Sequence, residues 1–276
     1  MPVATSSYAL AFALTLFAGL STGIGGFLAV IRRKEPSAGF MAAALGLSAG
    51  VMIYVSLVEL IPESVRTLSA VTAARAANWA AVGAFFVGIA AIAVIDRLVP
   101  ESINPHEPDL SLEDRRALRK SEAARGSALM RTGVFVSAAI AIHNFPEGFA
   151  TFIAGLEDAS VALPVAAAIA IHNIPEGIAV AVPMRHATRS RRKAFWWALA
   201  SGLAEPLGAL LGFLLFRPML GPGTIGVMFA LVAGIMVYIS LDELLPEAIA
   251  TGKHHTAIYG LIAGMAVMAV SLLLFV

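Results

Sequence analysis

The sequence of 276 residues contains no cysteine, and charged residues make up only 13% of it. Without cysteine the chain has no disulfides and no thiolate ligands, so any transition metal must be bound through nitrogen and oxygen. A charge content this low, beside 59% hydrophobic residues, lies outside the usual range of soluble domains. The composition therefore indicates a protein embedded in a lipid bilayer.

Long apolar stretches are what the sequence has instead. A helix needs about 20 apolar residues to cross the hydrocarbon core of a membrane. The alternating polarity of a membrane β-barrel does not recur along the chain. We therefore predict an all-α integral membrane protein that forms a single transmembrane domain, with eight spans at about 8–31, 40–61, 79–99, 129–153, 161–184, 194–216, 224–245 and 256–276.

The basic residues are distributed unevenly between the predicted loops. If both termini lie outside the cytoplasm, most of the 19 Lys and Arg residues fall in cytoplasmic loops, as the positive-inside rule requires. The longest of these loops, 100–128, contains only one histidine, His106, and reads more simply as a solvated linker than as a metal-collecting segment. No basic region or cleavage site marks a signal peptide, so we expect the first span to remain in the mature protein.

Two internal repeats organise the predicted spans. Residues 47–64 and 231–248 are identical at most positions, and they lie on spans that run in opposite directions. A shorter repeat, His143-Asn-Phe-Pro-Glu-Gly148 and His172-Asn-Ile-Pro-Glu-Gly177, places the same hexapeptide on spans 4 and 5. Inverted repeats are typical of secondary transporters. We predict an inverted 3+2+3 arrangement, in which the two central helices carry the chemistry.

The repeated hexapeptide has the features of a metal site. Its His and Glu are four residues apart, so both project from one face of a helix. Pro146 and Pro175 lack an amide hydrogen and are expected to free the carbonyls of Ile142 and Ile171. A single histidine or asparagine in a membrane can simply join helices, but repetition near the membrane centre favours a functional site. The candidate ligands are His143, Asn144, Glu147, His172, Asn173, Glu176 and, from Ser201-Gly-Leu-Ala-Glu-Pro-Leu-Gly208, Glu205.

Mixed imidazole and carboxylate ligands suit zinc, iron(II), manganese and cobalt, whereas magnesium and calcium usually take oxygen alone. The two hexapeptides and the Glu-Pro-Leu-Gly of span 6 resemble those of the ZIP (Zrt- and Irt-like) metal transporters, in particular their bacterial ZupT-like branch. The resemblance covers all eight spans. It implies import into the cytoplasm of zinc foremost, and also of iron(II), manganese, cobalt and cadmium, across the bacterial inner membrane by an eight-helix bundle that is often a homodimer.

The resemblance also implies a site for two ions in which Glu147 and Glu176 bridge. One position is lined by His143, Glu147, His172 and Glu176, and the other by Asn144, Glu147, Asn173, Glu176 and Glu205. The transported ions are the only bound cofactors expected, and no nucleic-acid partner is expected.

Further acidic residues lie near the predicted membrane surfaces. In the long repeat, Glu59 and Glu63 correspond to Glu243 and Glu247, and Asp242 precedes Glu243. The two copies place these acids at opposite ends of the membrane. We consider these five residues as metal ligands for access and release, against the alternative of solvated helix ends. His254 and His255, in the last loop, are weaker candidates for release.

Two other functions are weighed against a carrier. An intramembrane metalloprotease needs His-Glu-x-x-His, but asparagine follows each histidine here, and no nucleophile is paired with a base, so an enzyme is not expected. A metal-selective cation channel could also use a site with several carboxylates. Flux that saturates with metal concentration would favour the carrier.

Overall fold

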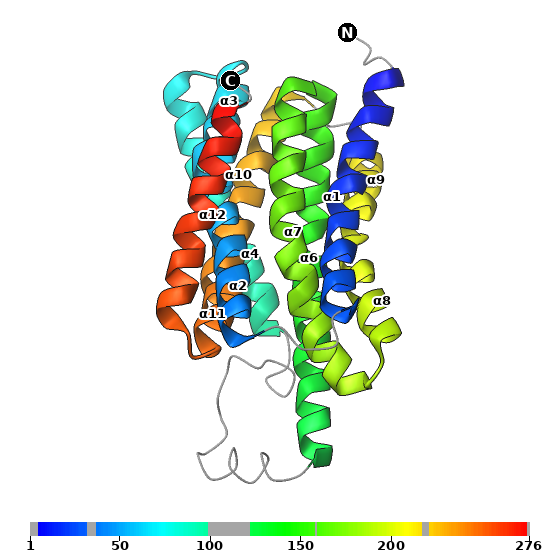
Figure 1. Ribbon diagram of the computed structural model, residues 1–276. Helices are drawn as coiled ribbons and strands as arrows, with labels where there is room; N and C mark the ends of the chain where they lie inside the picture. The colour runs from blue at the N-terminus through cyan, green and yellow to red at the C-terminus, as the bar shows by residue number, and fades with distance from the viewer. Residues whose placement is uncertain (1–4, 32–36, 99–121, 158, 217–220, 275–276) are drawn as a thin grey trace.

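The computed structural model describes residues 5–31, 37–98, 122–157, 159–216 and 221–274, and these form helices and no strand (Figure 1). The all-α prediction is therefore confirmed for this part of the chain. The helices are α1 (Thr5–Ile31), α2 (Ala38–Val55), α3 (Ile61–Ser69), α4 (Ala74–Leu98), α6 (Glu122–Glu157), α7 (Ala159–Thr188), α8 (Arg191–Gly202), α9 (Ala204–Phe216), α10 (Pro222–Ile239), α11 (Leu245–Ala250) and α12 (His254–Leu274), with two π-helical segments, η1 (Ser56–Leu60) and η3 (Ser240–Leu244).

Apolar helices of membrane-spanning length recur along the described chain. Six segments are long and apolar enough to cross a bilayer: Tyr8–Ile31, Ala38–Ser69, Ala74–Val94, Arg191–Leu215, Pro222–Ala250 and His254–Leu273. Since helices satisfy their own backbone hydrogen bonds, such segments are stable in lipid. The chain is thus a multi-pass α-helical membrane protein. Most of the predicted loop 100–128, with His106, lies outside the described residues; its last part, 122–128, begins α6.

Helices α6 and α7 pack together and occupy the centre of the bundle (Figure 1). On one side α1 packs along α7, and α9 packs along α6. On the other side α12 packs along α2, and α4 packs along α10. The outer helices α2 and α12, and likewise α4 and α10, therefore pair one helix from the first half of the chain with one from the second half.

The long repeat has the same local geometry in both copies. In each, a π-helical turn follows the α-helix: the amide of Ile61 donates to the carbonyl of Ser56, and the amide of Leu245 donates to that of Ser240. A proline follows one residue later in each copy and cannot donate to the carbonyl four residues back, which accounts for the wider turn. Segments η1 and α3 lead to one end of the bundle, and η3 and α11 lead to the other (Figure 1).

A single residue separates two helices within one candidate span. In Arg191–Leu215, α8 ends at Gly202 and α9 begins at Ala204, and Leu203 between them keeps a helical backbone. Pro206 explains the break, because it has no amide hydrogen for the carbonyl of Gly202 and its ring crowds that carbonyl. By contrast, α6 and α7 continue through Pro146 and Pro175. The interruption places Glu205 in the first turn of α9.

Candidate metal site

Six of the seven candidate ligands have described side chains, and all six are buried between three helices. The side chain of His143 lies outside the described residues, although its backbone belongs to α6. The six described side chains come from α6, α7 and α9, and each is at most 1% exposed: Asn144, Glu147, His172, Asn173, Glu176 and Glu205.

One side-chain contact between the hexapeptides joins the two central helices. Nε2 of His172 on α7 lies 3.0 Å from Oε1 of Glu147 on α6. Glu205 on α9 reaches the second hexapeptide as well, where its Oε1 accepts a hydrogen bond from Asn173. Burying several carboxylates is costly unless cations or hydrogen-bond donors compensate them. This cluster therefore has the charge and the ligand types that suit divalent cations.

The two asparagines are held by their amide nitrogens. Nδ2 of Asn144 donates to the carbonyl of Ser201 at 3.3 Å, and Nδ2 of Asn173 donates to the carbonyl of Ala18 at 3.0 Å and also to Oε1 of Glu205. Because carbonyls only accept hydrogen bonds, these contacts fix which side-chain atom is the oxygen. Both Oδ1 atoms accept no hydrogen bond from the described residues. They remain available to bind an ion.

Glycines in the hexapeptides set how closely the helices approach. A Cβ on Gly148 would meet the backbone of Glu205 on α9, and one on Gly177 would meet the carbonyl of Thr22 on α1. Both clashes involve backbone atoms, which cannot move aside as a flexible side chain can. The last residue of each motif therefore brings a neighbouring helix against the candidate ligands.

Ser48 on α2 is a neighbour of the site that the sequence analysis missed. Its hydroxyl donates to Oε1 of Glu176 at 3.0 Å and lies 3.4 Å from the carbonyl of His172. A lone serine among small residues in an apolar span usually indicates helix packing, so only its place within the long repeat could have drawn attention to it.

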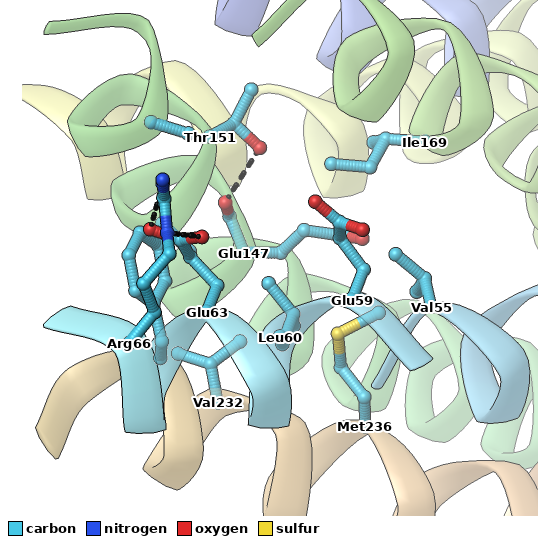
Figure 2. Close-up of a pocket in the computed structure, with 13 residues that line it drawn as sticks. Val55, Glu59, Leu60, Glu63, Arg66, Glu147, Thr151, Ile169, Val232 and Met236 are labelled. Atoms are coloured by element: carbon cyan, nitrogen blue, oxygen red, sulfur yellow. Dashed lines mark hydrogen bonds and ion pairs between the residues drawn. The ribbon is translucent and has the colours of Figure 1, made fainter. Parts of the chain in front are cut away.

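A pocket beside Glu147 includes two of the predicted access residues. Figure 2 shows Glu59 and Glu147 in this pocket, with Glu63 paired to Arg66 at 2.7 Å. The rest of the wall is mainly apolar and comes from α2, η1, α6, α7 and α10. Glu59 and Glu63 therefore share a pocket with one member of the buried cluster, Glu147.

The acids of the second repeat copy do not line this pocket. Asp242 is exposed, while Glu243 and Glu247 are partly buried at the η3 end. His254 and His255 are exposed at the start of α12, with ring centres 5.5 Å apart.

Among the described side chains, no three His, Asp or Glu groups are close enough to hold one ion together. In this conformation an ion in the buried cluster would therefore meet at most two of these groups, together with asparagine oxygens, water or His143, and a site with more of them requires the carboxylates to move closer together.

Comparisons with known proteins agree with the chemistry of this cluster. The family model described as ZIP zinc transporter matches residues 100–272. The zinc transporter ZupT of Corynebacterium aurimucosum is 63% identical over 272 residues, which cover 98% of this chain and 99% of that protein. The proteins of the same name from Corynebacterium glutamicum and Clostridium perfringens are 64% and 52% identical over 266 and 275 residues, covering 96% and 97% of this chain and 99% and 96% of theirs. The chain belongs to the ZIP zinc transporter family and is a transporter, not an enzyme.

Proposed function

We propose that the chain imports divalent transition-metal ions, zinc foremost, into the bacterial cytoplasm. The observation that carries this proposal is the buried cluster on α6, α7 and α9, in which His172 meets Glu147 and the asparagine oxygens have no donor among the described residues. Relatives that share over half of its residues along nearly the whole chain are named zinc transporters. The ligand types of the cluster and the names of the relatives therefore both support zinc transport.

The site is proposed to hold two ions. Zinc favours imidazole nitrogen with carboxylate oxygen, so the first position uses His143, Glu147, His172 and Glu176. The second position uses oxygen alone, from Asn144, Glu147, Asn173, Glu176 and Glu205. Iron(II), manganese, cobalt and cadmium are the further proposed substrates, because an oxygen-rich position beside a mixed one accepts ions of different preference.

Metal is proposed to reach the cluster through the pocket at Glu59 and Glu63. Both carboxylates line that pocket with Glu147, and opposite charge attracts cations into an apolar-walled cleft. Release is assigned to the η3 end, which carries Asp242, Glu243 and Glu247. Eight spans in an inverted 3+2+3 arrangement, in the inner membrane with both termini outside, and assembly as a homodimer complete the proposal.

Uptake by the purified protein tests this function. Reconstituted into liposomes, the protein is expected to accumulate radioactive zinc at a rate that saturates at micromolar metal, because each cycle must bind and release ions at one buried site. Iron(II) and manganese are expected to compete with zinc. Flux that rises linearly with metal concentration would support a metal-selective channel instead, and liposomes that take up no metal would contradict the proposal.

The proposed orientation gives a separate prediction. Because the chain has no cysteine, single cysteines report accessibility without background. Ser111→Cys, in the loop proposed to be cytoplasmic, is expected to resist an impermeant thiol reagent applied outside intact cells, whereas Ala159→Cys should react. Permeabilised cells serve as the control, in which both variants should react. The reverse pattern in intact cells would overturn the orientation.

A further inference from the structure

A third internal repeat relates α1 to the α8–α9 segment. Gly19-Leu-Ser-Thr-Gly-Ile-Gly25 and Gly202-Leu-Ala-Glu-Pro-Leu-Gly208 share both terminal glycines and the leucine, and the isoleucine of one matches a leucine of the other. In this alignment Thr22 takes the place of Glu205. Each of the two segments contacts one of the central helices, α1 on α7 and α9 on α6.

Those contacts correspond one by one. Gly177 lies against the carbonyl of Thr22, as Gly148 lies against that of Glu205. Gly25 and Gly208 lie against the carbonyls of Ile174 and Phe145, which hold the same place in the two hexapeptides. The segment α1 therefore packs on α7 as α9 packs on α6.

The asparagines extend this correspondence to the ligands. Asn173 donates to the carbonyl of Ala18, and Asn144 donates to that of Ser201. Ala18 and Ser201 each precede the first glycine of the third repeat, at Gly19 and Gly202. The amide of each asparagine is thus anchored at the same point of the opposing segment.

The hydroxyl of Thr22 is buried without a hydrogen-bond partner among the described residues. A threonine inside a helix commonly donates to the carbonyl four residues back, and Thr15 and Thr151 do so at 2.9 Å. For Thr22 that acceptor is Ala18, whose carbonyl already accepts from Ser21 at 2.6 Å and from Asn173 at 3.0 Å. The local structure therefore leaves this hydroxyl without its usual bond.

Other oxygens in the same condition all belong to the proposed metal site. Among the buried side-chain oxygens of the described residues, those that lack a hydrogen-bond partner belong to Thr22, Asn144, Glu147, Asn173 and Glu205. A buried oxygen without a partner costs about 1–3 kcal/mol. Native proteins usually retain such groups where water, an ion or a function uses them.

We propose that Thr22 is a further ligand of the all-oxygen metal position, as the neutral counterpart of Glu205. With it, that position takes three corresponding pairs of oxygens, from Asn144 with Asn173, Glu147 with Glu176, and Thr22 with Glu205. Six oxygens suit an octahedral ion such as manganese better than they suit zinc. A hydroxyl in place of a second unshared carboxylate makes binding weaker there, which favours release. This inference depends on the two-ion site proposed above.

Metal binding to the purified full-length protein tests it. In equilibrium dialysis, Thr22→Val is expected to weaken manganese binding about tenfold, the loss expected when a group supporting a metal site is removed. Zinc should be affected less, because its preferred position does not include Thr22. Thr22→Ser restores the hydroxyl and should bind manganese as the unmodified protein does. Glu205→Gln, which alters the paired ligand, should weaken manganese binding at least as much.

Thr15→Val is the matched control, because it removes a buried hydroxyl of the same helix that is already bonded to a backbone carbonyl. Unchanged manganese binding in Thr22→Val, or an equal loss in Thr22→Ser or Thr15→Val, would refute a role for Thr22 while leaving the two-ion site intact. If the unmodified protein binds fewer than two ions, the two-ion site itself is wrong, and the Thr22 ligand is excluded with it.

Discussion

Replacing Glu147 or Glu176 with alanine is expected to reduce zinc uptake at least about a hundredfold while leaving a folded, membrane-inserted protein. Each carboxylate is proposed to bridge both ions, so its loss removes a ligand from two positions at once. Glu147 also faces His172, and Glu176 accepts the hydroxyl of Ser48. Uptake of radioactive zinc into cells, corrected for the amount of protein in the membrane, measures the effect.

A second pair of variants separates charge from packing. Glu147→Gln and Glu176→Gln retain nearly the volume of the native side chain and can still form hydrogen bonds, but they lack the negative charge that a divalent ion needs. They are expected to transport as poorly as the alanine variants and to elute as the native protein does in size-exclusion chromatography. Near-normal zinc uptake by either alanine variant would show that the carboxylates do not form the path.

The membrane class and the candidate ligands could be predicted because their signals are local. Apolar runs of helix length indicate spans whatever surrounds them. The spacing of His and Glu in each hexapeptide is a property of one helix, and its repetition distinguishes it from chance. The structure accordingly places the described candidates of α6, α7 and α9 in one buried cluster.

Contacts between helices could not be predicted in the same way. Ser48 reaches Glu176 from α2, and Thr22 on α1 lies with its carbonyl against Gly177 of the second hexapeptide. Which helix packs on which depends on the sum of many small van der Waals contacts, and a serine or threonine in an apolar span carries little information about it.

The two copies of the long repeat are alike in sequence but differ in their contact with the pocket. Glu59 and Glu243 occupy equivalent places in the sequence and in the π-helical segments. Only Glu59 lines the pocket that contains Glu147. A sequence symmetry describes both ends of a transporter equally, whereas one conformation can join the site to one end alone. The pocket therefore supports the proposal that metal reaches the site from the end that carries Glu59.

The glycines that end the hexapeptides allow the helices that carry the ligands to approach closely, and an added Cβ at either position is expected to separate these helices. A Cβ at Gly148 or Gly177 meets backbone atoms of α9 or α1, which cannot yield without moving the whole helix. Metal ligands must be held to within about 0.5 Å, so such a movement disrupts the site even if the bundle survives.

Gly148→Ala and Gly177→Ala are therefore expected to lower zinc uptake at least about tenfold, since a ligand set displaced by a fraction of an ångström binds poorly. Their thermal unfolding midpoint should also fall, because two helices lose contact along their length. Gly83→Ala is the matched control: it lies inside α4, where an added Cβ meets nothing within 4 Å, and alanine favours the helix by about 0.5–1 kcal/mol. If the two motif variants transport and unfold as Gly83→Ala does, the close approach of α1 and α9 is not what shapes the site.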